Sequence, residues 1–183
     1  MPLARKVSES EVRETIRRYA VGVEYDGSHF HGWQSQSGVT TVQDLLESAL
    51  SSVAAEPVRV VTAGRTDTGV HASGQVAHFD TEAERTTLNW VRGANTNLPG
   101  GVALTWAKEV DRGFHARFSA LSRKYRYILF CRDVRPTYLA KRVSWTYECL
   151  DVQRMRAAAA CLEGRHDFSA FRASGCQAKQ PVR

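Results

Sequence analysis

The spacing of apolar positions along the first part of the chain predicts a strand followed by a helix. Residues 17–25, RRYAVGVEY, place alternate apolar side chains on one face, so we predict a strand that ends at the turn residues 26–28. Apolar residues then recur at helical spacing and predict an amphipathic helix over 41–54, capped by Thr40 or Thr41. The apolar face of this helix consists of Val42, Leu45, Leu46, Ala49, Leu50 and Val53.

The next elements switch between strand and helix periods. Residues 58–61 give a short apolar strand that runs directly into a glycine-bracketed loop, and residues 75–79 give another strand. A helix is predicted over 86–96, with Asn97 to Gly101 ending it, and residues 102–110 have the pattern of a strand. The resulting order is strand, helix, strand, strand, helix, strand. This is the order of the ferredoxin-like split unit.

The rest of the chain begins to repeat this order. Residues 124–130, KYRYILF, predict a strand, and residues 142–147 predict another. A helix follows over 152–162, and no closing strands come after it. The residues expected on the inward face of that helix are Met155, Ala159 and Leu162.

These patterns indicate an α+β fold of two ferredoxin-like α/β halves with antiparallel sheets, the second half incomplete. We expect a polar leader over residues 1–16 and an N-terminal α/β half over 17–112, which carries the glycine-bracketed loop. A truncated C-terminal α/β half covers residues 113–183.

The charge of the chain favours a polyanionic partner. Its 183 residues carry a formal net charge of +6, with 20 arginines and 5 lysines. Cations near phosphates release counterions, and the planar guanidinium binds phosphate bidentately and stacks on bases. A base composition that favours arginine codons gives the same count, so charge alone leaves nucleic-acid binding open.

Cysteine and histidine spacing argues against a metal site. The four cysteines form no CxxC pair, and no carboxylate or cysteine cluster joins the histidines. The start of the chain does not resemble a secretory signal, and no apolar run approaches the length of a membrane span. We therefore expect a cytoplasmic protein with free thiols, no metal and no membrane partner.

The loop Gly64-Arg65-Thr66-Asp67-Thr68-Gly69 is the strongest candidate site. It directly follows an apolar strand, and glycines at both ends permit tight backbone turns. An arginine and an aspartate two residues apart point the same way on an extended segment, where one can hold phosphate and the other act as nucleophile or base. A turn closed by a surface pair between Arg65 and Asp67 explains the same residues.

Four separated blocks resemble one known family. The string AGRTDTGVHASGQVAHF is very similar to the signature of the tRNA pseudouridine synthase A family, and the resemblance covers nearly everything after residue 17. The further blocks are YDGSHFHGWQSQ with TVQDLLESAL (25–36 and 41–50), FHARFSALSRKYRYILF (114–130) and CLEGRHDFSAFRA (161–173). The resemblance implies an isomerase that converts uridine to pseudouridine in tRNA, without cofactor or metal.

The resemblance also implies roles for individual residues. Asp67 matches the catalytic aspartate, which is a nucleophile toward the ribose or the uracil ring, or the base of a glycal route. Arg65 matches the arginine that helps to flip the target base out of its stack, and Tyr125 matches the tyrosine that packs on the uracil. Without the resemblance, Tyr125 has the pattern of a core strand aromatic.

Contacts with tRNA are implied elsewhere along the chain. Residues that match tRNA-contacting positions are Arg85, Phe114, His115, Ala116, Arg117, Phe118 and Lys179. Arg117 would hold backbone phosphate, while His71 and His78 are interpreted as structural. The implied substrate is the anticodon stem-loop, modified at uridines 38 to 40, and the implied assembly is a homodimer with a cleft that crosses both subunits.

The chain departs from the family in one respect. Members usually continue through an apolar strand and a basic helix whose arginine pairs with the catalytic aspartate, and we find no counterpart here. Three explanations of the missing segment are open: a truncated or frameshifted gene, an incomplete sequence, or a shortened variant. The alternatives to an active enzyme are therefore an inactive fragment and a non-catalytic RNA-binding module of the same fold. RRM domains share this frame, but their aromatic signature is absent and a pure binder has no need of Asp67.

Overall fold

The computed structural model describes residues 16–172 and 181–182. The chain forms two compact units, one up to Arg126 and the other from Tyr127 onward. By their contacts, residues 113–126 thus belong to the first unit. That the chain divides into two independent domains after residue 112 stays a prediction. Among the described residues, no helix is both long and apolar enough to cross a membrane.

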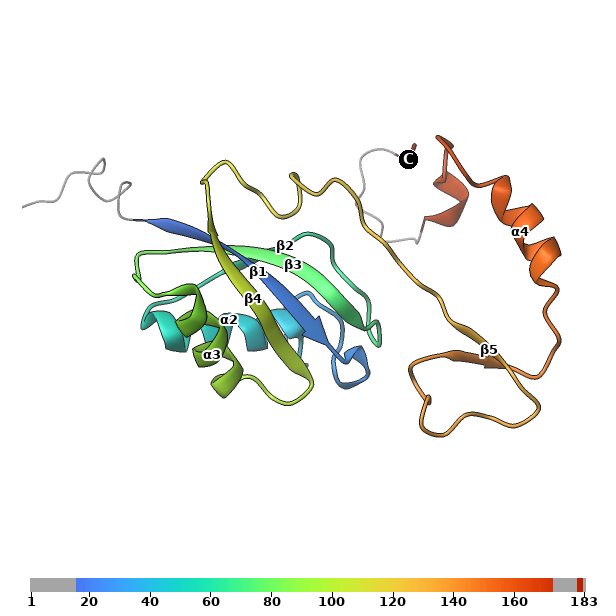
Figure 1. Cartoon of the computed structure of the whole chain (residues 1–183), viewed down its shortest axis with the longest axis horizontal. Coiled ribbons are helices and arrows are strands. Elements are labelled where there is room, and N and C mark those ends of the chain that lie inside the picture. Colours follow the sequence, from blue (N-terminus) through green and yellow to red (C-terminus); the bar gives the residue numbers. More distant parts are fainter. Residues whose placement is uncertain (1–15, 173–180, 183) are drawn as a thin grey trace, which may run out of the picture. The chain divides into compact units, whose positions relative to one another are not determined.

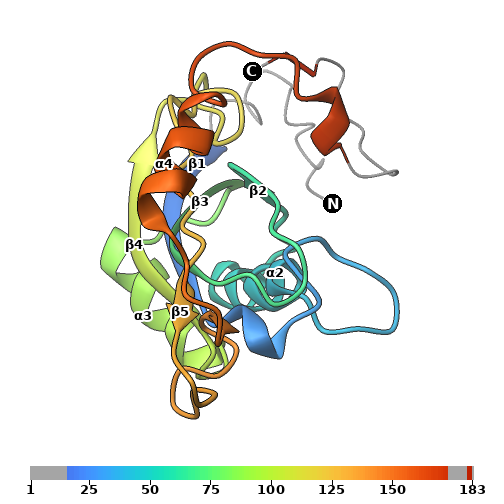
Figure 2. The same ribbon diagram turned by 90° about the vertical axis from the view of Figure 1, so that its right-hand side faces the viewer.

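The first unit is a four-stranded antiparallel sheet with two helices on one face (Figures 1 and 2). The strands lie in the order β2-β3-β1-β4, so the first strand is flanked on both sides. This confirms the ferredoxin-like order expected from the sequence. The elements are β1 (Arg17–Tyr25), the short 3-10 helix η1 (Gly27–His29), α2 (Val42–Ala54), β2 (Val60–Thr62), β3 (Ala72–Thr81), α3 (Thr87–Asn97) and β4 (Val102–Val110).

Alternation along β1 builds the core between the sheet and the helices. Tyr19, Val21 and Val23 are at most 1% exposed, as their spacing predicted. They pack with the apolar face of α2 and with two buried tryptophans, Trp33 and Trp90. Thr41 caps the start of α2, since its hydroxyl accepts a hydrogen bond from the amide of Asp44 at 3.3 Å.

A buried carboxylate ties α2 to the strand that leads into the loop. Glu47 is 6% exposed, and its oxygens accept hydrogen bonds from the amide of Val60 at 3.0 Å, the side chain of Gln43 at 2.9 Å and the guanidinium of Arg59 at 2.7 Å. A buried carboxylate is stable only when its lone pairs are satisfied in this way. Glu47 therefore fixes where β2 starts.

The second unit has less regular structure than the sequence predicted. It contains β5 (Leu129–Cys131), β6 (Ser144–Thr146), α4 (Val152–Ala160) and the 3-10 helix η2 (Ser169–Phe171). The predicted strand 124–130 is wrong over residues 124–128, which lie in no strand, since β5 begins only at Leu129. β5 and β6 pair in parallel rather than antiparallel, and the connection through residues 132–143 has the length that a parallel crossover needs.

The inward face predicted for the last helix is not buried. Met155 is 44% exposed and Leu162 is 49% exposed, and no residue of α4 is buried. Apolar spacing predicts a face but not what covers it. Here that face borders an open apolar hollow, whose other lining residues include Leu129, Cys131 and Leu150.

Removing the Glu47 carboxylate should destabilise the first unit. We expect Glu47→Ala to lower the free energy of unfolding by about 2 kcal/mol, because the amide of Val60 loses its acceptor in a buried setting. Glu47→Gln keeps one acceptor oxygen and should lose about half as much. Urea titration followed by tryptophan fluorescence measures both. The exposed Glu24→Ala is the control, and an equal loss in Glu24→Ala and Glu47→Ala would contradict this role.

Candidate active site

The glycine-bracketed loop joins β2 to β3, as the sequence predicted. Hydrogen bonds from residues of the first unit fix its backbone. The carbonyl oxygen of Thr66 accepts a hydrogen bond from the amide of Trp33 at 2.9 Å. The hydroxyl of Thr66 lies 2.8 Å from the hydroxyl of Tyr25, the last residue of β1. The carbonyl oxygen of Gly64 accepts from the side chains of Gln75 at 2.6 Å and Thr62 at 3.2 Å. The loop is therefore anchored at its entrance and at its middle.

Two glycines outside the loop allow it to lie this close to the core. A Cβ atom on Gly27 would lie 2.0 Å from the carbonyl oxygen of Val70, and a Cβ on Gly32 would lie 2.7 Å from that of Thr66. Gly32 also has φ of +84°, a conformation that other residues rarely adopt. The segment 25–36 thus packs directly against the loop and the residue that follows it. This close approach explains why Gly27 and Gly32 are glycines.

This anchoring sorts the loop side chains into an inner and an outer set. Thr66 is partly buried and bonds to Tyr25, while its neighbours Arg65 and Asp67 are both exposed. Burial raises the pKa of the Tyr25 hydroxyl, and the nearby Tyr125 adds to this, against hydrogen bonds from Thr66 and Gln75. Tyr25 therefore keeps its proton at neutral pH. The loop presents a guanidinium and a carboxylate to solvent from a fixed backbone.

Tyr125 lies at this loop and not in the core. Its side chain is 69% exposed, so the interpretation of Tyr125 as a core strand aromatic is wrong. Its hydroxyl lies 3.5 Å from the position that a Cβ on Gly64 would occupy. The structure thus brings Tyr125, from a distant part of the chain, to the start of the loop that carries Arg65 and Asp67.

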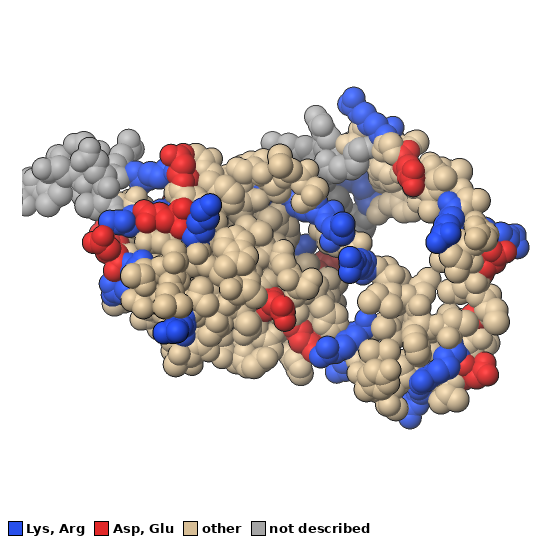
Figure 3. All heavy atoms as spheres, in the orientation of Figure 1, with Lys and Arg blue, Asp and Glu red and all other residues tan. Residues whose placement is uncertain are grey.

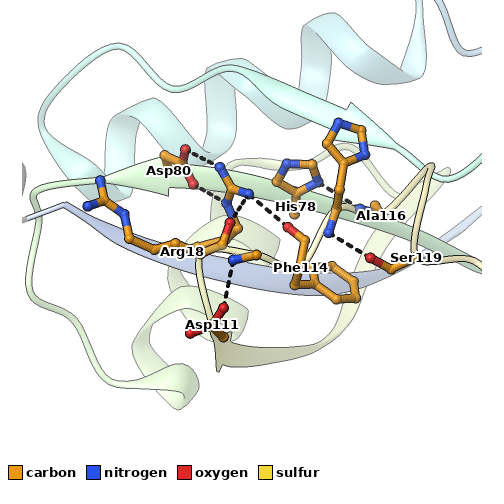
Figure 4. A network of polar contacts seen from close by, with 10 residues as sticks. Arg18, His78, Asp80, Asp111, Phe114, Ala116 and Ser119 are labelled. Atoms are coloured by element: carbon orange, nitrogen blue, oxygen red, sulfur yellow. Dashed lines mark hydrogen bonds and ion pairs between the residues drawn. The ribbon is translucent and has the colours of Figure 1, made fainter.

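The predicted RNA-binding segment 114–118 packs on the face of the sheet opposite the helices. After β4 the chain turns back across β1 and β3, where Arg18 donates two hydrogen bonds to Asp80, at 2.6 and 2.7 Å (Figure 4). The same guanidinium donates to the carbonyl oxygens of Arg112 at 2.7 Å and Phe114 at 2.8 Å. The hydrogen bonds from Arg18 hold the pKa of Asp80 below its usual range.

A buried histidine fixes the middle of that segment. His78 is 3% exposed, and its Nδ1 accepts a hydrogen bond from the amide of Ala116 at 3.1 Å (Figure 4). An accepting Nδ1 requires a neutral ring with the proton on Nε2. Burial lowers the pKa of His78, and the charges of Arg18 and His115 lower it further, against Asp80. His78 is thus placed as a structural residue.

The segment divides into inward and outward residues. Ala116 is 2% exposed, while the ring of His115 lies between those of His78 and Phe118, with centroids 4.8 and 4.3 Å away. Phe118 is 78% exposed, and the guanidinium of Arg117 lies 5.8 Å from its ring centroid. Arg117 and Phe118 are therefore the members of the segment that are available to a partner.

The remaining predicted contacts lie apart from the loop or outside the described residues. The backbone carbonyl of Arg85 accepts a hydrogen bond from Tyr19, near the start of β1, and its side chain is exposed. The loop lies beyond Tyr25, at the other end of that strand, about 20 Å away at the usual rise per residue. Lys179 lies outside the described residues.

Figure 3 shows basic and acidic side chains interleaved on the first unit, so its positive charge is not gathered into one patch on the face shown. Among the described residues, no group of three histidine, cysteine or carboxylate side chains is placed to hold a metal ion. The Nδ1 atom of His71 lies 3.1 Å from the carboxylate of Asp26.

Sequence reasoning missed three residues that organise the site. Arg123 donates to the carbonyl oxygens of Ala63 and Arg117, Arg18 holds the segment 114–118, and Tyr25 holds the loop. The signals were present but weak. Arg18 pairs with Asp80 only through strand register, and Arg123 stands two residues before Tyr125 without a regular element to orient it.

Comparison with known proteins finds one matching family model and several similar proteins. A family model described as tRNA pseudouridine synthase matches residues 22–119. The protein named tRNA pseudouridine synthase A in Nitrosococcus oceani is 59% identical, over 91% of this chain and 64% of the relative. The protein of the same name in Pseudomonas aeruginosa is 55% identical, over 92% of this chain and 59% of the relative. The relative from Methylobacillus flagellatus is 58% identical over 91% and 64%. The chain therefore spans less than two thirds of the length of these relatives.

The buried neutral His78 predicts a loss of stability in mild acid. The unfolded chain takes up a proton at the usual pKa of about 6.5, while the folded pKa is lower. The unfolded state thus binds more protons as pH falls below about 6.5, and the free energy of unfolding should decrease until the folded pKa is passed. Urea titrations between pH 5 and 7.5 measure this. His78→Gln should flatten the slope and the exposed His31→Gln should not; equal slopes in both would contradict the assignment.

Proposed function

The chain belongs to the tRNA pseudouridine synthase family, and from that premise we propose that it carries the site that isomerises uridine to pseudouridine in tRNA, with Asp67 as the catalytic residue. One observation carries the proposal. The loop backbone is fixed at Thr66, and Arg65 and Asp67 on either side of it are exposed. The hydroxyl of Tyr125 lies at Gly64, where the same loop begins. A turn that served only to close an Arg–Asp surface pair has no need of an aromatic ring from another part of the chain.

The proposed reaction is an isomerisation, so it needs no second substrate. The bond from uracil N1 to the ribose carbon breaks, the ring turns, and C5 bonds to the same carbon. The C5 proton is lost and N1 gains a proton, so the composition of the substrate does not change. Asp67 either forms a transient bond to the ribose or the uracil ring, or removes a ribose proton on a glycal route. Each route uses an ionised carboxylate, and bound RNA would cover the exposed Asp67 and shield it from water.

Arg65 and Tyr125 have the properties that base flipping requires. A uridine in a stacked stem must leave the stack before its glycosidic bond can be reached. Arg65 is exposed beside Asp67, where a planar guanidinium can replace the extruded base in the stack. Tyr125 presents an exposed ring next to Gly64, where it can pack against the uracil. The two side chains would then hold the base while Asp67 reacts.

The tRNA contacts extend from the loop along the first unit. We assign Arg117 and Phe118 to the RNA backbone and bases close to the loop, because both are exposed on an anchored segment. Arg85, at the far end of β1, would reach a phosphate about 20 Å away along the stem. His115 and Phe114 support the segment, and Lys179 completes the set of residues that we assign to tRNA. We assign the anticodon stem-loop, at uridines 38 to 40, as the target of a cytoplasmic homodimer.

Substitution of Asp67 tests the catalytic assignment. Asp67→Asn should abolish pseudouridine formation on unmodified tRNA, because the amide cannot act as nucleophile or base, while tRNA binding changes by less than about threefold. Chemical labelling of pseudouridine with mass spectrometry measures the product, and a filter-binding titration measures affinity. Product formation by Asp67→Asn at the wild-type rate would exclude Asp67. A wild-type chain that binds tRNA without product would instead be an inactive fragment or an RNA-binding module.

Substitution of Arg117 tests the phosphate contact. Arg117→Ala should weaken tRNA binding and reduce the slope of log affinity against log salt by about one, since one cation no longer displaces a counterion. The rate at saturating tRNA should change little. Arg92→Ala removes an exposed cation from α3 and is the matched control, with an unchanged slope. Equal slopes for Arg117→Ala and the wild type would rule out the contact.

A further inference from the structure

We propose that Arg123 is a positioning residue that couples the tRNA-binding segment 114–118 to the loop of Asp67, an inference that rests on the proposed function. Arg123 lies between the two, in a stretch without helix or strand, and its guanidinium contacts the backbone of both. It would act through the positions of Asp67 and Tyr125, without touching the substrate.

The geometry of the guanidinium supports this role. Nε and Nη2 both donate to the carbonyl oxygen of Ala63, at 2.9 and 2.6 Å, and Nη2 also donates to the carbonyl oxygen of Arg117 at 2.9 Å. A planar fork with five N–H groups can bridge two carbonyls in fixed directions, whereas a lysine ammonium on a flexible stem cannot hold the same relation. Arg123 thus joins two backbone points that are distant in sequence.

One of these points is where the sheet ends and the catalytic loop begins. The amide of Ala63 still pairs with the carbonyl oxygen of Val76, at 2.8 Å, while its own carbonyl points to Arg123. A Cβ on the next residue, Gly64, would lie 3.3 Å from both Cδ and Nε of Arg123. The arginine stem therefore lies directly over Gly64, and a larger residue there would push it away.

The other point completes the anchoring of the RNA-binding segment. Arg18 holds the segment at the carbonyl of Phe114, and His78 holds it at the amide of Ala116. Arg123 adds a third anchor, at the carbonyl of Arg117. A phosphate bound by the Arg117 side chain would thus be held at a fixed place relative to the loop.

The same contacts explain how Tyr125 stays at the loop. Residues 121–128 lie in no helix or strand, so strand pairing does not orient the tyrosine. Arg123 stands two residues before it and is fixed to Ala63, which brings the Tyr125 hydroxyl to within 3.5 Å of the Cβ position of Gly64. Loss of the guanidinium would release Tyr125 and Arg117 together, without removing a side chain that contacts RNA.

Hydrogen exchange on the full chain without RNA tests the contact directly. Arg123→Gln should speed amide exchange in peptides that cover residues 63–71 and 115–120 by about tenfold or more, while peptides from β1 and α2 stay unchanged. Arg123→Lys should give a smaller local increase. The control Lys124→Gln removes the same charge from the neighbouring residue and should leave both regions at the wild-type rate. Uniformly faster exchange over the whole first unit would make Arg123 a general stability residue and overturn the proposal.

Kinetics on unmodified tRNA then separate positioning from phosphate binding. We expect Arg123→Gln to lower the rate at saturating tRNA by about 10²-fold, since small misplacement of reacting groups has effects of that size, with partial rescue in Arg123→Lys. The salt slope of tRNA affinity should stay at the wild-type value. Arg123 would instead be a phosphate ligand if Arg123→Gln lowered the salt slope of tRNA affinity by about one while hydrogen exchange and the rate at saturating tRNA stayed at wild-type values. That result would overturn the proposal. If the wild-type chain forms no pseudouridine, the proposed function fails, and hydrogen exchange still decides on Arg123.

Discussion

The central strand β1 must be covered on both faces, and much of the first unit follows from that constraint. Tyr19, Val21 and Val23 are buried toward the helices, while Ala20 on the other face is 3% exposed. One face forms the core with α2 and α3. The other is covered at one end by the returning segment 112–119, through Arg18 and its cross-strand partner Asp80 (Figure 4). Because both of its faces are covered, β1 contacts the helices on one side and the segment 112–119 on the other.

Different positions of β1 organise the two parts of the candidate site. Tyr25, at the end of the strand, holds Thr66 and with it the loop of Asp67. Arg18, near the start, holds the carbonyl of Phe114 and so the segment with Arg117. Between these two positions β1 is paired on both sides, with β3 and with β4. The two parts of the candidate site are therefore anchored to one strand.

The polar contacts of the site differ in how strongly they depend on burial. The Arg18–Asp80 pair makes two parallel hydrogen bonds on a partly buried face, and the neutral ring of His78 accepts from Ala116 where water is excluded. Arg123 is exposed, and its hydrogen bonds to carbonyl oxygens compete with water. The loop entrance is thus the part of the site where substitutions should act most locally.

The sequence alone determined the elements of the first unit and the residues of the loop. Alternation in β1, helical spacing in α2 and turn residues before β4 are local signals, and the strand β4 has the bounds that its pattern predicted. The sequence did not determine which residues pack against each face of a strand or helix, because those residues come from distant parts of the chain. Residues 124–128 have strand spacing but lie in no strand, and no residue of α4 is buried although its apolar spacing predicted an inward face. Only the tertiary structure placed Tyr125 beside Gly64 and joined the Arg123 guanidinium to Ala63, since the Arg123–Ala63 contact spans 60 residues and leaves no local pattern.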